Sequence, residues 1–319
     1  MALPLTPPLE PQLARTAKDL PSGADWRYEP KWDGFRTVVF RDGDEVYLQS
    51  RGGRPMERYF PEVIPQVLAL SVERVVLDGE LIVVVDGVQE FDRLSQRIHP
   101  AASRVERLAA ETPAAFVAFD LLAEEDELLL ELPYDERRAR LEGLIAAPVE
   151  LTPCTRDREA AGAWLTGSSE GVIAKDGTAP YRPGERAGMT KIKRMRTAEA
   201  VVKAFRFGKH EGTVGSLILG LYDDEGELRE VGHTSGFTAK QKRELLDVLE
   251  PYRTHESGSG EPSRWKSDEE LVWEGLRPEL VAEITFDHVS GHRIRHGARF
   301  QRWRPDKAPR ECRIEQLSS

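Results

Sequence analysis

Residues 29–35, EPKWDGF, place a lysine between a proline and an Asp-Gly pair. Proline fixes φ and Asp-Gly favours a turn, so Lys31 lies beside a reversal of the chain. Glu29, Asp33 and Arg36 surround it with charge in the sequence. A lysine is a nucleophile only when it is neutral, and its ordinary pKa is about 10.4. Because burial and a neighbouring cation such as a metal ion lower that pKa, Lys31 is a candidate nucleophile.

Such a lysine attacks either a carbonyl carbon or a phosphorus atom. Schiff-base lysines act on carbonyls, usually in barrels whose strands and helices alternate, and this sequence has no such alternation. Phosphorus is therefore the better interpretation. A purely structural turn lysine stays open at this point, because Lys-x-Asp-Gly fixes only three residue types.

Outward from Lys31, the first half of the sequence is typical of strands and hairpins. Apolar runs flank an Asp-Gly turn within 37–50, and a second hairpin turns at Asp86-Gly87 within 75–91. We expect a buried strand at 114–122, with 128–132 pairing back on it, and a short strand at 169–177. Helices are expected at 61–70, 90–98, 103–110, 134–146 and 157–166. Pro61, Asp135 and Asp157 are residue types that suit the starts of the first, fourth and fifth of these.

The pattern changes near residues 195–200. Short strands at 200–208, 214–233 and 280–288 surround one helix at 238–252, with Thr238 as its candidate N-cap, and 257–263 is expected to be a flexible loop. Many short strands with one helix favour a small β-barrel of the OB-fold type. The sequence therefore predicts an α+β protein of two domains, an antiparallel-sheet domain at 1–197 and an OB-fold domain at 198–319.

Composition limits the class of protein. The chain has 319 residues, 39% of them hydrophobic and 31% charged, which is typical of a globular protein. No apolar run approaches the length of a membrane span, and the N-terminus does not resemble a signal peptide, so we expect a cytoplasmic protein without membrane contact. Cys154 and Cys312 are far apart, which indicates reduced thiols and argues against zinc.

Charge is unevenly distributed. The net charge of −10 argues against a polyanionic partner for the chain as a whole. Two basic tracts, 182–209 and 293–313, nevertheless stand out in this acidic sequence. Each is either a local polyanion site or a solvated strand face, and charge alone leaves both open.

Further polar residues accompany Lys31 in chain order. Asp78-Gly79-Glu80 is expected at a turn between two strand runs, and Glu170 at the start of a strand. Lys191 and Lys193 alternate, so both face one side of a strand. The two carboxylates can hold a divalent metal or a ribose hydroxyl, and the two cations can hold a phosphate. Phe119 can stack on a base, although Phe119 would also suit the hydrophobic core. Together they predict a nucleotide pocket.

The ordered set resembles the covalent nucleotidyltransferases, most closely the ATP-dependent DNA ligases. It is similar to the compact bacterial class that includes LigC and the ligase domain of LigD, and the resemblance covers nearly the whole chain. The matched motifs are Lys31-Trp-Asp-Gly-Phe-Arg36, Ser50-Arg51, Asp78-Gly-Glu80, Phe119-Asp-Leu, Glu170-Gly-Val-Ile-Ala-Lys175, Lys191-Ile-Lys193 and Arg304-Pro-Asp306-Lys307.

The resemblance implies a nucleotidyltransferase (adenylation) domain followed by an OB-fold domain, with ATP and Mg²⁺ or Mn²⁺ as cofactors. Lys31 would form the lysyl-adenylate, Lys191 and Lys193 would contact the α-phosphate, and Asp306 and Lys307 would orient the pyrophosphate. The implied metal ligands are Glu170 and Glu80. The implied nucleotide-binding residues are Glu29, Pro30, Lys31, Arg36, Arg51, Glu80, Phe119, Arg186, Lys191, Lys193 and Arg304.

The activity that the resemblance implies is the sealing of nicked double-stranded DNA, in repair or recombination. A monomer is expected, with a hinge near 195–199 and contacts to other repair proteins. Two features depart from the family pattern: Met189 replaces an aromatic residue, and the helical domain of larger ligases is not expected ahead of Lys31. The alternatives are an RNA ligase or mRNA-capping guanylyltransferase, or a non-catalytic OB-type nucleic-acid-binding protein.

Overall fold

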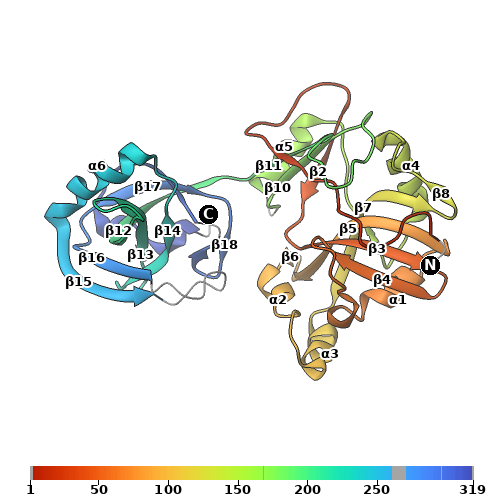
Figure 1. Ribbon diagram of the computed structural model, residues 1–319, viewed down its shortest axis with the longest axis horizontal. Coiled ribbons are helices and arrows are strands. Elements are labelled where there is room, and N and C mark those ends of the chain that lie inside the picture. The colour runs from red at the N-terminus through yellow and green to blue at the C-terminus, as the bar shows by residue number, and fades with distance from the viewer. Residues whose placement is uncertain (1–2, 168, 261–270, 296, 318–319) are drawn as a thin grey trace. The chain divides into compact units, whose positions relative to one another are not determined.

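The computed structural model describes residues 3–167, 169–260, 271–295 and 297–317. The chain forms two compact units, Met1–Arg194 and Met195–Ser319 (Figure 1). The division falls one residue before the long strand β12 (Arg196–Phe207), so the expected boundary at 197/198 lies inside that strand.

The first unit contains two sheets, and all the matched motifs except the one at 304–307 lie on or beside their strands. The larger sheet has the order β4-β3-β5-β7-β8, and in addition β6 pairs with β5 and β9 pairs with β7. Its strands are β3 (Phe35–Asp42), β4 (Glu45–Ser50), β5 (Arg74–Val85), β6 (Val88–Gln89), β7 (Ala114–Glu124), β8 (Glu127–Leu128) and β9 (Glu150–Leu151). The smaller sheet has the order β1-β11-β10-β2, formed by β1 (Arg15–Thr16), β11 (Met189–Lys193), β10 (Gly171–Asp176) and β2 (Trp26–Lys31).

The apolar run of β5 explains why the larger sheet is buried on both faces. Val75 and Leu77 pack into one hydrophobic cluster, and Val76 between them packs into another. Successive side chains of a strand point to opposite faces, so a continuous apolar run requires cover on each side. The helices of this unit are α1 (Val63–Leu68), α2 (Phe91–Ser95), α3 (Ala102–Glu111), α4 (Tyr134–Leu144) and α5 (Arg158–Thr166).

The helix and hairpin predictions for this unit are confirmed within a few residues. Asp157 caps α5 by accepting from the backbone N–H groups of Glu159 and Ala160. Both hairpins form, because β3 pairs with β4 and β5 with β6 across their Asp-Gly turns. Pro61 does not start a helix, since α1 begins at Val63.

The predicted turn at Asp78-Gly79-Glu80 is wrong. These residues lie in the middle of β5, which pairs with β3 on one side and β7 on the other. Strand pairing on both sides outweighs the local turn preference of Asp-Gly, although the register with β7 shifts between Asp78 and Gly79. Gly79 is needed for packing instead, because a Cβ there would lie 2.4 Å from the ring of Phe116.

The second unit is a curved sheet closed around one core, as expected for an OB-fold barrel. Its path is β14-β13-β12-β16-β15, and β17 joins β12 to β20. The strands are β12, β13 (Val214–Tyr222), β14 (Leu228–Thr234), β15 (Arg253–Gly260), β16 (Leu271–Leu276), β17 (Val281–Phe286), β18 (Val289–Ser290), β19 (Arg293–Ile294) and β20 (Arg299–Trp303). The first half of β12 pairs with β17 and its second half with β16, and bulges in its pairing with β13 help the sheet curve.

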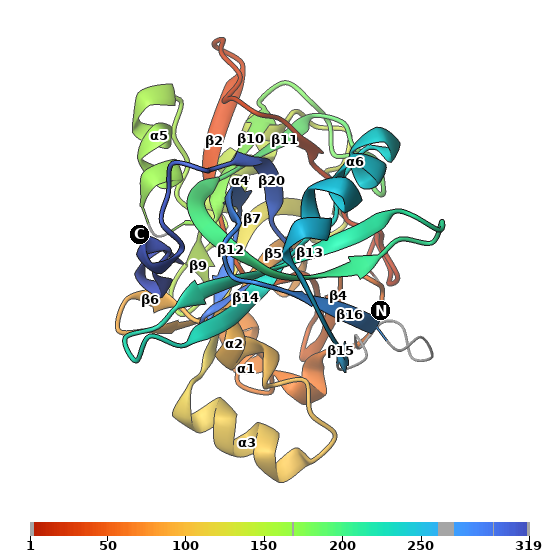
Figure 2. The same cartoon turned by 90° about the vertical axis from the view of Figure 1, so that its left-hand side faces the viewer.

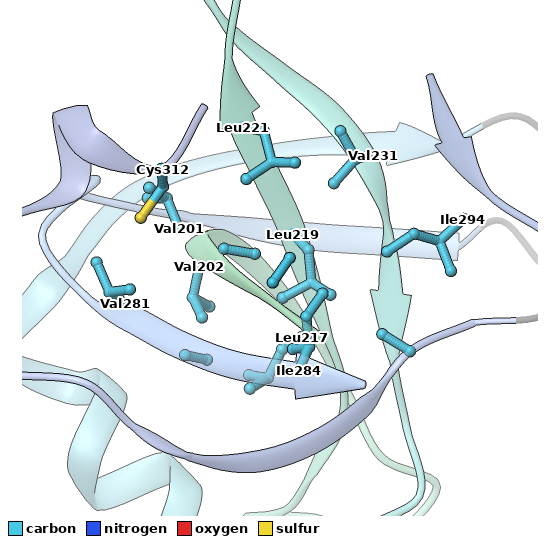
Figure 3. Packing of buried hydrophobic residues seen from close by; sticks show 14 of the residues in the cluster. Val201, Val202, Leu217, Leu219, Leu221, Val231, Val281, Ile284, Ile294 and Cys312 are labelled. Carbon is cyan, nitrogen blue, oxygen red and sulfur yellow. The ribbon is translucent and has the colours of Figure 1, made fainter. Parts of the chain in front are cut away.

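The barrel interior is apolar. Val201, Leu219 and Ile284 from three different strands point into it (Figure 3). The helix α6 (Ala239–Leu249) packs beside β13 (Figure 2). Thr238 forms the expected N-cap, in a capping box with Gln241. Short 3-10 turns complete the chain at η1 (Glu57–Tyr59), η2 (Glu250–Tyr252), η3 (Pro309–Glu311) and η4 (Ile314–Leu317).

The loop predicted at 257–263 is wrong for residues 257–260, which belong to β15 and pair with β16. Ser and Gly have low strand propensity, but the hydrogen bonds of the ladder fix them. Residues 261–263 lie outside the described residues. Across the described ranges, no helix has the length and apolar character needed to cross a membrane.

Candidate active site

A pocket in the first unit brings most of the predicted site residues together. Side chains of both sheets line it, along with the N-terminal segment 11–14. Of the predicted residues, the pocket is lined by Glu29, Pro30, Lys31, Arg36, Arg51, Glu80, Phe119, Arg186 and Lys191.

Lys31 ends β2, and its ammonium contacts the carboxylate of Glu170. The contact follows from strand register, since Gly171 lies opposite both Lys31 on β2 and Lys193 on β11. Lys193 lies 3.5 Å from the other carboxylate oxygen of Glu170. A Cβ at position 171 would lie 2.1 Å from the carbonyl oxygen of Ile192, so only glycine permits this close approach of the strands. Two lysines therefore converge on one carboxylate.

The pocket has a strongly cationic wall. Burial lowers the pKa of Lys191 below its usual value, and the positive charges of Lys193, Lys31, Arg51 and Arg186 lower it further. These cations repel one another, and a bound anion would relieve that repulsion. This wall suits a polyphosphate.

The pocket also has a partly buried ion pair beside an aromatic ring. Arg36 donates to both carboxylate oxygens of Asp78, at 2.5 and 2.6 Å, and its guanidinium lies 4.4 Å from the ring centroid of Phe119. Glu80 lies opposite Arg36 on β5. Burial raises the pKa of the Glu80 carboxyl to about 7, although Arg36 and Lys31 oppose the shift. Phe119 is only 7% exposed but lines the pocket, so it is both a core residue and a wall residue.

Two buried, charged side chains, Glu29 and Lys175, line the pocket. Glu29 is 2% exposed, and its carboxylate accepts hydrogen bonds from the Tyr134 hydroxyl and forms an ion pair of 3.0 Å with Lys175. Tyr134 belongs to none of the matched motifs. Lys175 ends a matched motif but is not among the expected site residues. Met189, the departure from the family pattern, is buried and also lines the pocket.

The N-terminal segment is a further wall that sequence reasoning missed. β1 pairs with β11 in parallel, and the Gln12 backbone N–H donates to the Tyr181 hydroxyl at 2.9 Å. Tyr181 in turn donates to Asp78 at 2.6 Å. A parallel pairing between residues 175 positions apart has no local signature in a sequence.

The donor set of the pocket fits a divalent cation with few protein ligands. Glu80 and Glu170 are near enough for the charge of Glu170 to raise the pKa of Glu80. Mg²⁺ prefers oxygen ligands and commonly keeps water and substrate phosphate oxygens in its shell, so two carboxylates suffice. Within the part of the chain that the structure describes, no three His, Cys, Asp or Glu side chains form a closed metal cluster.

Arg304, Asp306 and Lys307 belong to the second unit. The Arg304 guanidinium binds Glu199 at 2.7 Å and Asp306 at 2.8 Å, and Lys307 lies 3.3 Å from Glu311. Hydrogen bonds from Arg304 hold the pKa of Asp306 down to about 2, so this carboxylate is ionised. Its side chain is 64% exposed and therefore accessible to a ligand.

Comparison with known proteins identifies the family. The profile described as "ATP dependent DNA ligase domain" matches residues 11–193, and that described as "ATP dependent DNA ligase C terminal region" matches residues 210–307. The chain is 44% identical to DNA ligase C1 of Mycolicibacterium smegmatis, over 100% of this chain and 96% of that protein. It is 43% identical to DNA ligase C of Mycobacterium tuberculosis, over 99% of this chain and 96% of that protein.

A solved structure agrees. The crystal structure of the ligase domain of M. tuberculosis LigD is 30% identical, with a TM-score of 0.53 and coverage of 95% of this chain and 97% of that one. Family profiles, full-length relatives and a solved structure therefore all indicate a DNA ligase, in agreement with the lysine pocket and the barrel. The chain belongs to the ATP-dependent DNA ligases.

Proposed function

We propose that this protein seals nicks in double-stranded DNA through an AMP bound covalently to Lys31. The observation that carries the proposal is the position of Lys31 in a pocket where Glu170, Lys191 and Lys193 surround it. A neutral amine beside cations that can hold a phosphate is what nucleophilic attack on phosphorus requires.

In the first step, the Lys31 ammonium passes its proton to the adjacent Glu170 carboxylate, and the Nζ lone pair attacks the α-phosphorus of ATP. A P–N bond forms, the bond to the bridging oxygen breaks, and pyrophosphate leaves. Lys191 and Lys193 stabilise the negative charge that develops on the phosphate oxygens. Glu170, which contacts the Lys31 ammonium in this structure, holds the side chain in place before reaction.

In the second step, the 5′-phosphate of a nick attacks the lysyl-AMP phosphorus, and the P–N bond breaks. In the third step, the 3′-hydroxyl attacks that 5′-phosphate and AMP leaves, which joins the strand. Both steps use the same cationic wall, because each transfers a phosphoryl group in line.

The remaining pocket residues bind the nucleoside. Glu29 and the backbone at Pro30 read the adenine edge, and Phe119 stacks on the ring. Arg36, Arg51 and Glu80 hold the ribose or the DNA phosphate, and Arg186 supports the phosphate wall. Glu80 and Glu170 would hold Mg²⁺ or Mn²⁺, which neutralises phosphate charge when bound.

The second unit contributes Arg304, Asp306 and Lys307 to the first step. Asp306 and Lys307 orient pyrophosphate for in-line departure, and Arg304 holds Asp306. This role needs a hinge near 195–199 that brings the unit over ATP and releases it for DNA.

The biological setting is DNA repair. Relatives named multifunctional non-homologous end joining protein LigD share 32% identity over 90% of this chain, which covers 37% of the M. smegmatis protein. This likeness supports a repair role, with other repair proteins as partners. We further propose that the protein is a cytoplasmic monomer.

Labelled nucleotides test the activity. The protein is incubated with α-labelled ATP or GTP and then with nicked DNA or nicked RNA duplexes. We expect covalent label from ATP only, removed by pyrophosphate, and sealing of nicked DNA. Label from GTP would favour a capping guanylyltransferase, sealing of RNA alone an RNA ligase, and DNA binding without any label a non-catalytic OB-type protein.

A further inference from the structure

Lys175 ends the matched stretch 170–175, yet the roles proposed above leave it unused. It lies on β10, is 3% exposed, and lines the pocket. Burial of an ammonium group is unfavourable unless partners compensate for the lost water. Its partners therefore indicate what the side chain does.

The Lys175 ammonium joins the two groups proposed to bind the base. It lies 3.0 Å from a carboxylate oxygen of Glu29, and it donates to the backbone carbonyl of Phe119 at 2.8 Å. It also lies 4.7 Å from the ring centroid of Phe119. Glu29 is on β2 and Phe119 on β7, which belong to different sheets. One charge therefore fixes the distance between an edge contact and a stacking ring.

A second donor fixes the other oxygen of Glu29. The Tyr134 hydroxyl donates to it, and Tyr134 is 2% exposed. Burial and then the charge of Glu29 raise the pKa of this phenol well above its usual value, so it remains a donor. A carboxylate has about four acceptor sites, so Glu29 can still accept from a ligand.

We propose that Lys175 is a positioning residue that makes the pocket select adenine over purines without a 6-amino group. The inference rests on the proposed adenylation of Lys31. Held by Lys175 and Tyr134, with Arg138 at 3.8 Å, the Glu29 carboxylate is a fixed acceptor for the 6-amino group of adenine. Guanine presents a carbonyl oxygen at that position, and two acceptors repel each other.

The test compares ATP with purine riboside 5′-triphosphate, which lacks the 6-amino group. Single-turnover adenylation of the full chain is measured against nucleotide concentration. In Lys175→Met we expect the ATP concentration for half-maximal rate to rise about 10- to 100-fold, as for a lost charge-assisted hydrogen bond. The value for the analogue should change little, and the maximal rate with ATP should persist. The preference for ATP over the analogue would then collapse.

Two further variants keep the test decisive. Arg97→Met removes another buried cation, paired with Glu62 away from the pocket, and should leave the preference unchanged. Tyr134→Phe removes one hydroxyl and should lower the preference about three- to tenfold, so it decides the matter if Lys175→Met does not fold.

The outcomes separate two kinds of failure. A parent protein that forms no lysyl-AMP with ATP would contradict the proposed function. If the parent is adenylated while Lys175→Met and Tyr134→Phe keep its preference for ATP, the role of Lys175 is overturned. Equal losses with both nucleotides would likewise indicate a merely structural lysine.

Discussion

The cations of the pocket and those of the tract 293–313 meet opposite electrostatic surroundings. At the pocket, Lys31 and Lys193 share Glu170, and burial together with four neighbouring cations lowers the pKa of Lys191. In the C-terminal tract, most cations have a carboxylate within the second unit. The pairs are Arg293 with Glu230, Arg302 with Glu283, Arg304 with Glu199, Lys307 with Glu311, and Arg313 with Asp224.

This contrast separates crowded cations from cations that already have a carboxylate partner. A nearby carboxylate offsets the charge of its cation, and exposed ion pairs contribute only about 0–1 kcal/mol each to stability. Crowded cations in a pocket repel one another, and a phosphate relieves that repulsion. The two basic tracts look alike in sequence; the first, 182–209, supplies Arg186 and Lys191 to the pocket.

The largest effect is expected from the nucleophile itself. Lys31→Ala should abolish both covalent adenylation and the sealing of ordinary nicks, because no other group replaces the amine. Mass spectrometry after incubation with ATP checks this: the parent gains one AMP and the variant none. AMP on the variant protein would show that a different residue is the nucleophile.

Next in size is the loss of a pocket cation. Lys191→Ala should slow adenylation about 100-fold, as for the removal of one donor to a developing oxyanion. Arg313→Ala is the matched control, because it removes a surface cation already paired with Asp224. Single-turnover rates should fall for the first and stay within about twofold for the second. Similar losses in both would remove the distinction between the two regions.

Asp306 is expected to have an intermediate effect confined to one step. Asp306→Ala should slow lysyl-AMP formation about tenfold, the effect of about 1.4 kcal/mol, because pyrophosphate is less well oriented. Sealing of a pre-adenylated nick should be nearly normal. The control is Asp224→Ala, which removes an exposed carboxylate of the same unit. If pre-adenylated nicks were sealed as slowly as ordinary ones, the carboxylate would act in a later step.

The last effect concerns the dependence of stability on pH and leaves the rates aside. Burial raises the pKa of Glu80 from 4.5 to about 7, so the folded protein binds this proton more tightly than the unfolded chain. Its contribution to stability is fully present below about pH 4.5 and is lost as pH rises through about 7. The loss is at most about 3 kcal/mol. Thermal unfolding of the ligand-free protein should therefore show Glu80→Gln gaining on the parent as pH rises from 4.5 to 8. A constant difference across that range would mean that Glu80 ionises normally.

Much of the site could be predicted from residue order and strand periodicity. Alternation places Lys191 and Lys193 on one face of β11, and the matched motifs mark Lys31, Glu170 and Phe119. The wrong predictions came from local turn and loop preferences, which the pairing of strands distant in sequence overrides. Asp78-Gly79 became the middle of a strand, and residues 257–260 became part of β15.

The sequence by itself determined which chemical groups this protein carries and in what order, because periodicity and turn preference act over a few residues. Only the tertiary structure decided which cations pair with a carboxylate and which lie close to other cations in the pocket. Lys175 reaches Glu29 and Phe119, and Gln12 reaches Tyr181, through contacts between residues distant in the chain. The physical reason is that burial and Coulomb interactions depend on distance in space, which a linear sequence does not contain.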